Sequence, residues 1–186
     1  MTLSPDQVRV FQTGEVWVAP TGTTLPTTLT GALDPLFDSL GYTAEDGVTI
    51  APELGVTEIM AWQSRSPIRI VETSRVMRIT VPGFEFNDQA VEVYFGGGAF
   101  SSVDSTTELF TPPEPGTVTK WACVFDTQDG IDQYRWVFDQ VVLTEVGEIS
   151  HVKDAASTLQ VTLTALAGTD GDAGWRYYRT KNATTS

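Results

Sequence analysis

The sequence has 186 residues, with 24 acidic and 11 basic side chains, so its formal net charge at pH 7 is −13. Proteins that bind nucleic acids or acidic membrane surfaces do so with Lys and Arg. This charge balance therefore argues against a broad surface that binds either nucleic acid or an acidic membrane. The length suits one domain, which buries roughly 70% of the surface of its unfolded chain and needs no disulfide. The single Cys123 excludes an intrachain disulfide, and no apolar run approaches the roughly 20 residues of a membrane span. We therefore expect a protein without a membrane anchor that is made in a cytoplasm.

Seven segments are predicted as β-strands, because they are rich in β-branched and aromatic residues or alternate apolar with polar side chains. They are residues 15–19, 56–63, 68–81, 105–110, 117–125, 134–145 and 157–166. In the last segment Leu159, Val161 and Leu163 alternate with polar residues, as in an antiparallel sheet with one buried and one solvated face. The sequence therefore predicts a mainly β fold of two packed antiparallel β-sheets, a β-sandwich or barrel, with one or two short α-helices.

Two short helices are predicted from their capping residues. Residues 34–41 begin with Asp-Pro, a capping residue followed by the proline that fits the first helical position, and end at a glycine. Residues 87–95 begin with an Asn cap and end before Gly96–Gly98, although residues 91–94 also fit a strand.

Three segments contain few side chains that can form a core. Residues 1–13 are expected to form an N-terminal arm, residues 21–32 a Thr-rich loop and residues 168–186 a C-terminal arm, so that residues 14–167 form the domain. The aromatic run at 175–179 is the exception within the C-terminal arm. Its side chains must dock either on the domain or on another subunit, and both alternatives stay open.

Candidate catalytic and metal-binding groups are few. Residues 126–132 resemble a calcium-binding loop, but Val137 stands where such a loop needs a bidentate Glu. His151 is the only histidine, and a neighbouring serine in the sequence does not make a catalytic triad. Gly96–Gly98 lacks the Lys-Ser/Thr of a phosphate-binding loop. We expect no catalytic residue, no metal site and no cofactor, and a protein that builds or binds rather than an enzyme.

Exposed tryptophans suggest an alternative function. Aromatic rings stack on sugars, and a β-sandwich with an aromatic platform could serve as a carbohydrate-binding or adhesion module. Four tryptophans lie in predicted strands, where packing in the core is the usual role, and Trp175 lies in the C-terminal arm. This alternative therefore depends on Trp175.

Six segments resemble, in order and spacing, the major tail proteins (tail tube proteins) of siphophages of the actinobacteriophage type. They are residues 14–20, 21–26, 40–49, 61–63, 68–81 and 94–97. The resemblance covers roughly the first hundred residues, and the second half of the chain adds little to it.

This resemblance implies a structural protein of the virion tail. Six subunits would close into a ring, their inner sheets would form one β-barrel around a lumen, and rings would stack into a tube through loops and arms. Head-to-tail contacts between copies close into rings in this way, and closure removes exposed sheet edges. The partners would be other copies of the chain and the tape-measure, tail terminator and distal tail proteins. DNA would pass through the lumen during ejection without specific binding.

The same resemblance suggests site residues. Acidic side chains that face the lumen would repel DNA phosphates, and we expect Glu58, Glu72 and Glu85 there, because they lie in or beside strands of the inner sheet. Contacts between subunits or rings are expected from the Thr-rich loop and the C-terminal arm. These contact residues are Thr23, Leu25, Pro26, Trp175, Tyr177 and Tyr178.

Overall fold

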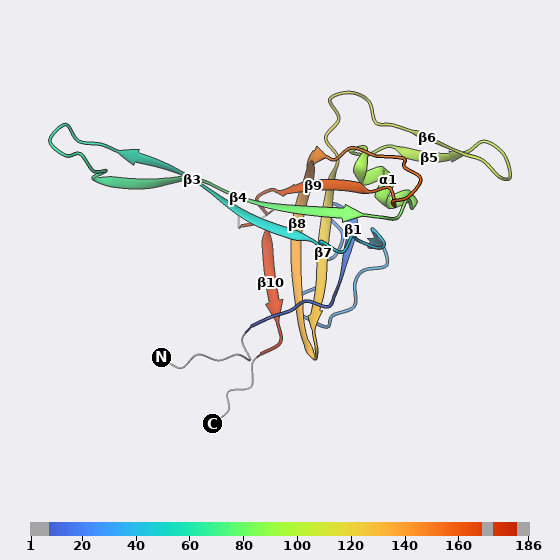
Figure 1. Ribbon diagram of the computed structural model, residues 1–186, viewed down its shortest axis with the longest axis horizontal. Coiled ribbons are helices and arrows are strands. Elements are labelled where there is room, and N and C mark those ends of the chain that lie inside the picture. The colour runs from blue at the N-terminus through green and yellow to red at the C-terminus, as the bar shows by residue number, and fades with distance from the viewer. Residues whose placement is uncertain (1–7, 169–172, 182–186) are drawn as a thin grey trace.

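The computed structural model describes residues 8–168 and 173–181, and these form ten strands and one short helix (Figure 1). The strands are β1 (Thr13–Pro20), β2 (Asp38–Ser39), β3 (Thr49–Ile59), β4 (Arg69–Gly83), β5 (Ala99–Ser102), β6 (Glu108–Thr111), β7 (Lys120–Asp129), β8 (Asp132–Val146), β9 (Leu159–Ala165) and β10 (Trp175–Arg179). The helix is α1 (Asp88–Tyr94). The predicted mainly β class with a short helix is therefore confirmed.

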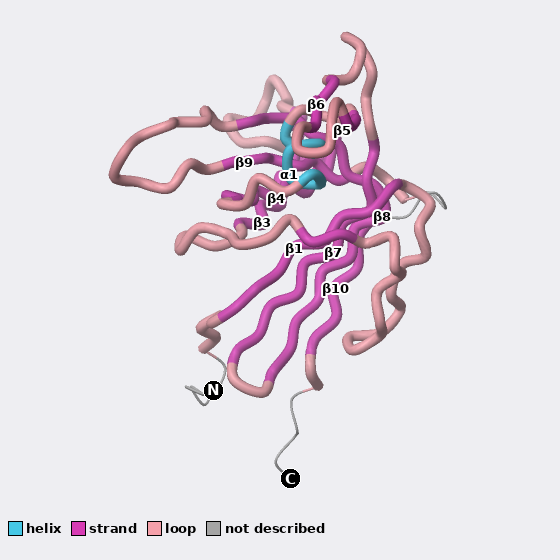
Figure 2. Tube along the Cα trace, turned by 90° about the vertical axis from the view of Figure 1, so that its right-hand side faces the viewer, coloured by secondary structure: helices cyan, strands magenta, loops and turns pink. Residues whose placement is uncertain are grey.

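Eight of these strands form one antiparallel sheet in the order β2-β1-β7-β8-β9-β4-β3, to which β10 is added as a further partner of β8. Along one edge, β8 pairs with β10 through residues 134–138 and with β9 through residues 141–146, while β7 pairs along its other edge. The sheet therefore branches at β8. Figure 2 shows β1, β7, β8 and β10 side by side as one layer. The strands β5 and β6 form a separate ribbon.

The core lies between two parts of this one sheet. On one side of the core lie alternate residues of β1, β7 and β8, such as Val18 and Phe138. On the other side lie buried residues of β4, β9 and α1, such as Ile79, Leu163 and Val93. The predicted two packed layers are thus present, but they belong to one continuous sheet that folds over itself.

A second, smaller cluster lies on the opposite face of β1, β7 and β8. It contains Ala19, Phe37, Ala122, Val124 and Val137, and residues of the segment between β1 and β2 pack against it. The Thr-rich loop therefore covers the outer face of the layer, and both faces of β7 and β8 are buried.

The predicted helix at residues 34–41 is wrong. Asp34 to Phe37 form a turn, in which the Phe37 amide donates to the Asp34 carbonyl at 2.9 Å, and β2 follows at once. Phe37 is buried in the second cluster, whereas Leu40 is buried in the first. A helix would place residues three apart on the same face, so it cannot bury these two side chains on opposite sides of β1.

The predicted helix at residues 87–95 is confirmed as α1. The Asn87 side-chain oxygen accepts a hydrogen bond from the Ala90 amide at 2.8 Å, which caps the first turn. Gly96, Gly97 and Gly98 all have positive φ, so the chain turns back directly after the helix.

Three strands differ from the prediction. β3 begins at Thr49 rather than at residue 56, and it contains Pro52, which is tolerated because β3 is an edge strand. β5 lies in residues 99–102, for which the sequence predicted no strand. β10 occupies the described part of the expected C-terminal arm and pairs with β8 of its own chain.

Candidate functional site

The hairpin of β3 and β4 projects far from the body of the molecule, and the β5–β6 ribbon projects on the other side (Figure 1). At its base, Met77, Ile79 and Val81 of β4 are buried in the core. Beyond the base, Pro52 to Ile59 and Arg69 to Arg75 are largely exposed. The ladder nevertheless continues without a gap in pairing to Ile59 and Arg69, with one bulge after Gly55.

The projecting hairpin exposes a run of large apolar side chains. They are Leu54, Val56, Ile59, Met60, Trp62, Ile68 and Ile70, with exposed fractions between 41% and 100%. Trp62 has the highest value, at 100%. Exposed apolar side chains gathered on one projecting element indicate an interaction site.

The tip of the hairpin is basic, although the protein as a whole is acidic. Arg65 and Arg69 are exposed there, and neither forms an ion pair within the described part of the chain. Further down the hairpin, Arg75 is paired with Glu72, with Nε at 2.9 Å from Oε1. The tip therefore combines apolar side chains with two exposed positive charges.

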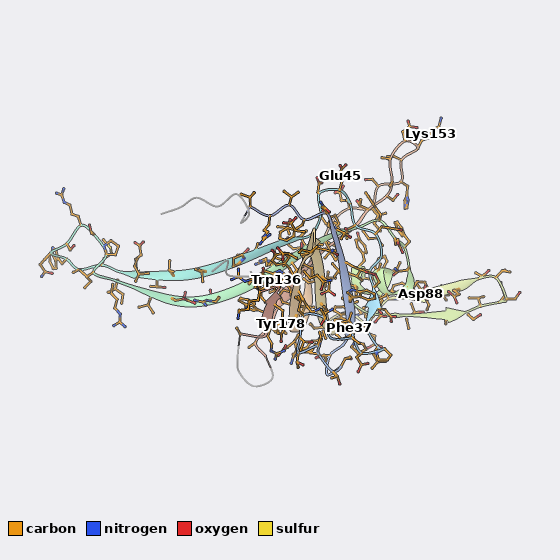
Figure 3. All side chains as sticks on the ribbon, turned by 90° about the horizontal axis from the view of Figure 1, so that it is seen from below. Phe37, Glu45, Asp88, Trp136, Lys153 and Tyr178 are labelled. Atoms are coloured by element: carbon orange, nitrogen blue, oxygen red, sulfur yellow. The ribbon has the colours of Figure 1, made fainter. Side chains whose placement is uncertain are left out.

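A groove of about 1100 Å³ lies on the body, lined mainly by residues of β1, β7, β8 and β10 and by the segment between β2 and β3. We call the aromatic part of this lining the floor and the part from Ser39 to Val48 the wall. The aromatic lining residues are Phe11, Tyr42, Phe125, Tyr134, Trp136 and Tyr177, and the acidic ones are Glu15, Glu45, Asp46 and Glu85. None of the described residues that line the groove is Lys, Arg or His. Figure 3 shows Glu45 and Trp136 on the body, away from the projecting hairpin.

Aromatic contacts fix the floor of this groove. The Tyr177 and Trp136 ring centroids lie 4.4 Å apart, and the Trp175 and Trp136 centroids lie 5.7 Å apart. Phe11 contacts Tyr134 edge to face at 5.2 Å. Partial burial raises the pKa of Tyr177. The residue as a whole remains 40% exposed. The floor is thus a fixed aromatic surface, on which Tyr177 is exposed and Trp136 is half-buried, while Phe125 and Tyr134 are buried.

The three carboxylates predicted to face a lumen lie in two places. Glu58 and Glu72 are exposed on the projecting hairpin. Glu85 is half-buried between β4 and α1, accepts a hydrogen bond from the Tyr42 amide at 2.9 Å and lines the groove. The structure therefore does not bring these three side chains together.

The contact residues predicted in the Thr-rich loop are used within the chain. Leu25 packs on the second cluster and Pro26 is buried. The Thr23 hydroxyl donates to the Pro20 carbonyl at 2.8 Å. Farther along the loop, the Arg135 guanidinium donates to the carbonyls of Thr28 at 3.2 Å and Gly31 at 2.7 Å. The loop is thus held to its own domain.

The contact residues predicted in the C-terminal arm also lie on the domain. Trp175 packs against the main core and Tyr178 against the second cluster, while Tyr177 faces the groove. The sequence left docking in the same chain or on another subunit open, and the structure places these residues on their own chain. Of the three, Tyr177 is exposed enough to contact a second molecule.

The remaining candidates for chemistry are separated from one another. His151 is exposed, and its Nδ1 lies 3.4 Å from the Ser157 hydroxyl. Cys123 is fully buried, and this burial raises its pKa to about 12. Among residues 8–168 and 173–181, no group of three or more His, Cys, Asp or Glu is placed to hold a metal ion. The single helix, α1, is too short to cross a membrane in the described part of the chain.

Comparison with known proteins places the chain in a family. The family model described as "Phage tail tube protein" matches residues 1–185. No curated protein matches the sequence. A solved chain from the virion of a native gene transfer agent particle is similar in structure, with a TM-score of 0.44 and 10% sequence identity over 89% of this chain and 95% of that chain. Because the family model spans almost the whole sequence, the chain belongs to the family of phage tail tube proteins.

Proposed function

We propose that the protein is the major tail tube subunit of a siphophage. Six copies close into a ring, and rings stack into the tube of the virion tail. The tape-measure, tail terminator and distal tail proteins contact this tube, and DNA passes through its lumen during ejection.

One observation carries this proposal beyond family membership. The β3–β4 hairpin is a long ladder, paired on both sides of its one bulge, that projects from the body and exposes Trp62 completely. A solvated hairpin of this length that bears seven exposed apolar side chains gains stability only when a partner covers it. In a family whose members form a tube, the partner is another copy of the chain.

Purified protein tests the proposal directly. Sedimentation velocity over a wide range of concentrations should show growth from monomer to large particles, and negative-stain electron microscopy should show rings or tubes with six subunits per ring. Assembly into rings of another symmetry would change the proposed number of subunits per ring but not the proposal that the protein forms a tube. A protein that stays monomeric at every concentration would overturn the proposal.

The net charge of −13 has a defined role in this assembly. Acidic side chains on the lumen wall repel DNA phosphates over roughly the Debye length, about 8 Å at physiological salt, so DNA slides without sticking. Glu58 and Glu72 stay the candidates for this wall, because both are exposed on the hairpin. Phage that carry Glu58→Gln and Glu72→Gln should assemble normally but eject DNA more slowly. The matched control Glu148→Gln should not change ejection, and an unchanged rate in the double variant would remove these two residues from the lumen.

A further inference from the structure

We infer that the tip of the β3–β4 hairpin of one copy docks into the aromatic, acidic groove of a neighbouring copy. Trp62 then lies against the aromatic floor, and Arg65 and Arg69 lie against the acidic wall. This inference rests on the proposed self-assembly and adds to it which two surfaces meet.

The tip is a preformed surface element. The Ser64 amide donates to the Ala61 carbonyl at 3.1 Å, and the Ile68 amide donates to the Ile59 carbonyl at 2.9 Å, so the turn is closed by backbone hydrogen bonds. The Ser64 hydroxyl also donates to the Ser66 carbonyl at 2.8 Å. The tip therefore loses little conformational entropy when a partner binds it.

The groove cannot receive the tip of its own hairpin. Ile50, at the base of β3, itself lines the groove, and β3 runs away from it to Ile59. At about 3.3 Å per strand residue, the tip lies about 30 Å from the groove. The ladder is paired on both sides of its one bulge, so the hairpin does not fold back on its own groove. Only another copy can bring a tip to this groove.

The two surfaces have opposite charges. Glu45 and Asp46 are exposed at the turn that forms one wall of the groove, and no ion pair to either is present among the described residues. The other two groove carboxylates already accept hydrogen bonds, Glu15 from the Ser39 hydroxyl and Glu85 from the Tyr42 amide. The two arginines of the tip therefore fit best against Glu45 and Asp46. Such complementarity fixes the orientation of an interface more than it adds affinity.

The apolar surfaces also match in kind. A groove of about 1100 Å³ is as large as sites that hold drug-sized ligands, so it accommodates an indole ring and the residues beside it. The Trp136 and Tyr177 rings at 4.4 Å offer an aromatic pair on which Trp62 stacks. Buried Trp, Tyr and Arg side chains are the groups that dominate binding energy at interfaces.

Tip and groove lie at different places on one chain, so the contact is head to tail. A head-to-tail contact repeats from copy to copy and yields rings or open filaments, depending on the rotation between neighbours. The contact therefore fits a protein whose copies close into rings and whose rings stack.

Charge reversal on either surface tests the docking. Arg65→Glu with Arg69→Glu should raise the protein concentration needed for assembly at least tenfold, and so should Glu45→Lys with Asp46→Lys. All four changes together should restore assembly towards the wild-type level, because opposite charges face each other again. The control is Glu148→Lys with Asp154→Lys, two exposed acidic residues outside tip and groove, which should assemble like the wild type.

Mixing the two charge-reversed proteins gives a sharper result. The copy with the altered tip keeps an intact groove, and the copy with the altered groove keeps an intact tip. An equimolar mixture should assemble with the two proteins in alternation, because each tip then meets a groove of opposite charge, whereas neither protein assembles alone at the same concentration. Sedimentation velocity of the two proteins, separately and mixed, detects this assembly.

A disulfide trap gives an independent readout that does not depend on charge. Arg65→Cys and Glu45→Cys copies, mixed under oxidising conditions, should form a cross-linked dimer, while the native Cys123 is buried and does not interfere. The control is Arg65→Cys mixed with Glu148→Cys, which should not cross-link. Circular dichroism confirms that each variant is folded.

The outcomes separate the docking from the proposed function. If the wild type assembles but the charge reversals and the cross-link have no effect, the docking is wrong and the tube subunit stands. If the wild type never assembles, the proposed function fails and the docking fails with it.

Discussion

Arg135 of β8 and Asp126 of β7 form a two-bond ion pair across adjacent strands, with Nε–Oδ1 and Nη2–Oδ2 distances of 2.7 Å. The third nitrogen of the guanidinium donates to the Thr28 and Gly31 carbonyls. Only 8% of the Arg135 side chain is exposed. This one side chain therefore connects the central strands to the Thr-rich loop on the outer face.

Arg135→Lys should destabilise the folded chain by about 2–4 kcal/mol, because the ammonium group cannot make the paired bonds and leaves buried acceptors without donors. The matched control is Arg75→Lys. Arg75 makes the same kind of two-bond pair with Glu72, at 2.9 and 3.1 Å, but 61% of its side chain is exposed. Its loss should cost less than about 1 kcal/mol. Urea unfolding of unassembled protein measures both, and equal losses would mean that burial of the Arg135 pair is unimportant.

Gly174→Ala should detach β10 from β8. Gly174 has a φ of 70°, and a Cβ there would collide with the Leu166 carbonyl oxygen. We expect a loss of about 2–5 kcal/mol, from a left-handed backbone and from the collision. Gly47→Ala is a close control, because Gly47 also has a φ of 70° but a Cβ there meets no atom within 4 Å. It should cost about 1–2 kcal/mol. Amide exchange along β10 separates the two, and equal protection in both variants would contradict the collision.

Leu163→Ala should destabilise the chain by about 2–5 kcal/mol, because Leu163 is fully buried between the two layers and its truncation leaves a cavity. Leu54→Ala removes the same atoms from a side chain that is 60% exposed on the hairpin, so it should change the stability of the monomer by less than about 0.5 kcal/mol. Both are measured at a concentration where the wild type is monomeric, since assembly raises apparent stability. A large loss for Leu54→Ala in the monomer would mean that the hairpin packs on its own body.

Cys123 should be unreactive in the folded protein. Burial raises the pKa of its thiol from 9.0 to about 12, so at pH 8 almost none of it is the reactive thiolate. A disulfide reagent such as dithionitrobenzoate should modify no thiol in native protein and one thiol per chain in denaturant. Rapid modification of the native protein at pH 8 would contradict the burial of β7.

Much of the fold could be predicted from local pattern. The segments that became β1, β4, β7, β8 and β9 carry β-branched or alternating residues, and Asn87 caps α1 as its sequence position suggests. The helix predicted at residues 34–41 failed because two apolar residues, Phe37 and Leu40, pack on opposite sides of β1. That constraint comes from tertiary packing, which capping signals do not contain.

The groove could not be predicted, because it joins segments far apart in the chain. Its floor depends on pairing between Trp136 of β8 and Tyr177 of β10, and this register appears only in the folded sheet. The exposure of Trp62 was also hidden, since a tryptophan in a strand-like run usually packs in a core. A useful signal was present in the turn beside it, where Arg65 and Arg69 lie close together in an acidic chain.

The branch at β8 gives the sheet three terminal strands, β2, β3 and β10, where an unbranched sheet has two. A ring that closes by pairing the edges of neighbouring sheets uses two edges of each subunit. One edge per subunit then has no neighbour within the ring. In the proposed tube these spare edges would recur at every subunit, as a regular array of backbone donors and acceptors on which another extended chain could pair.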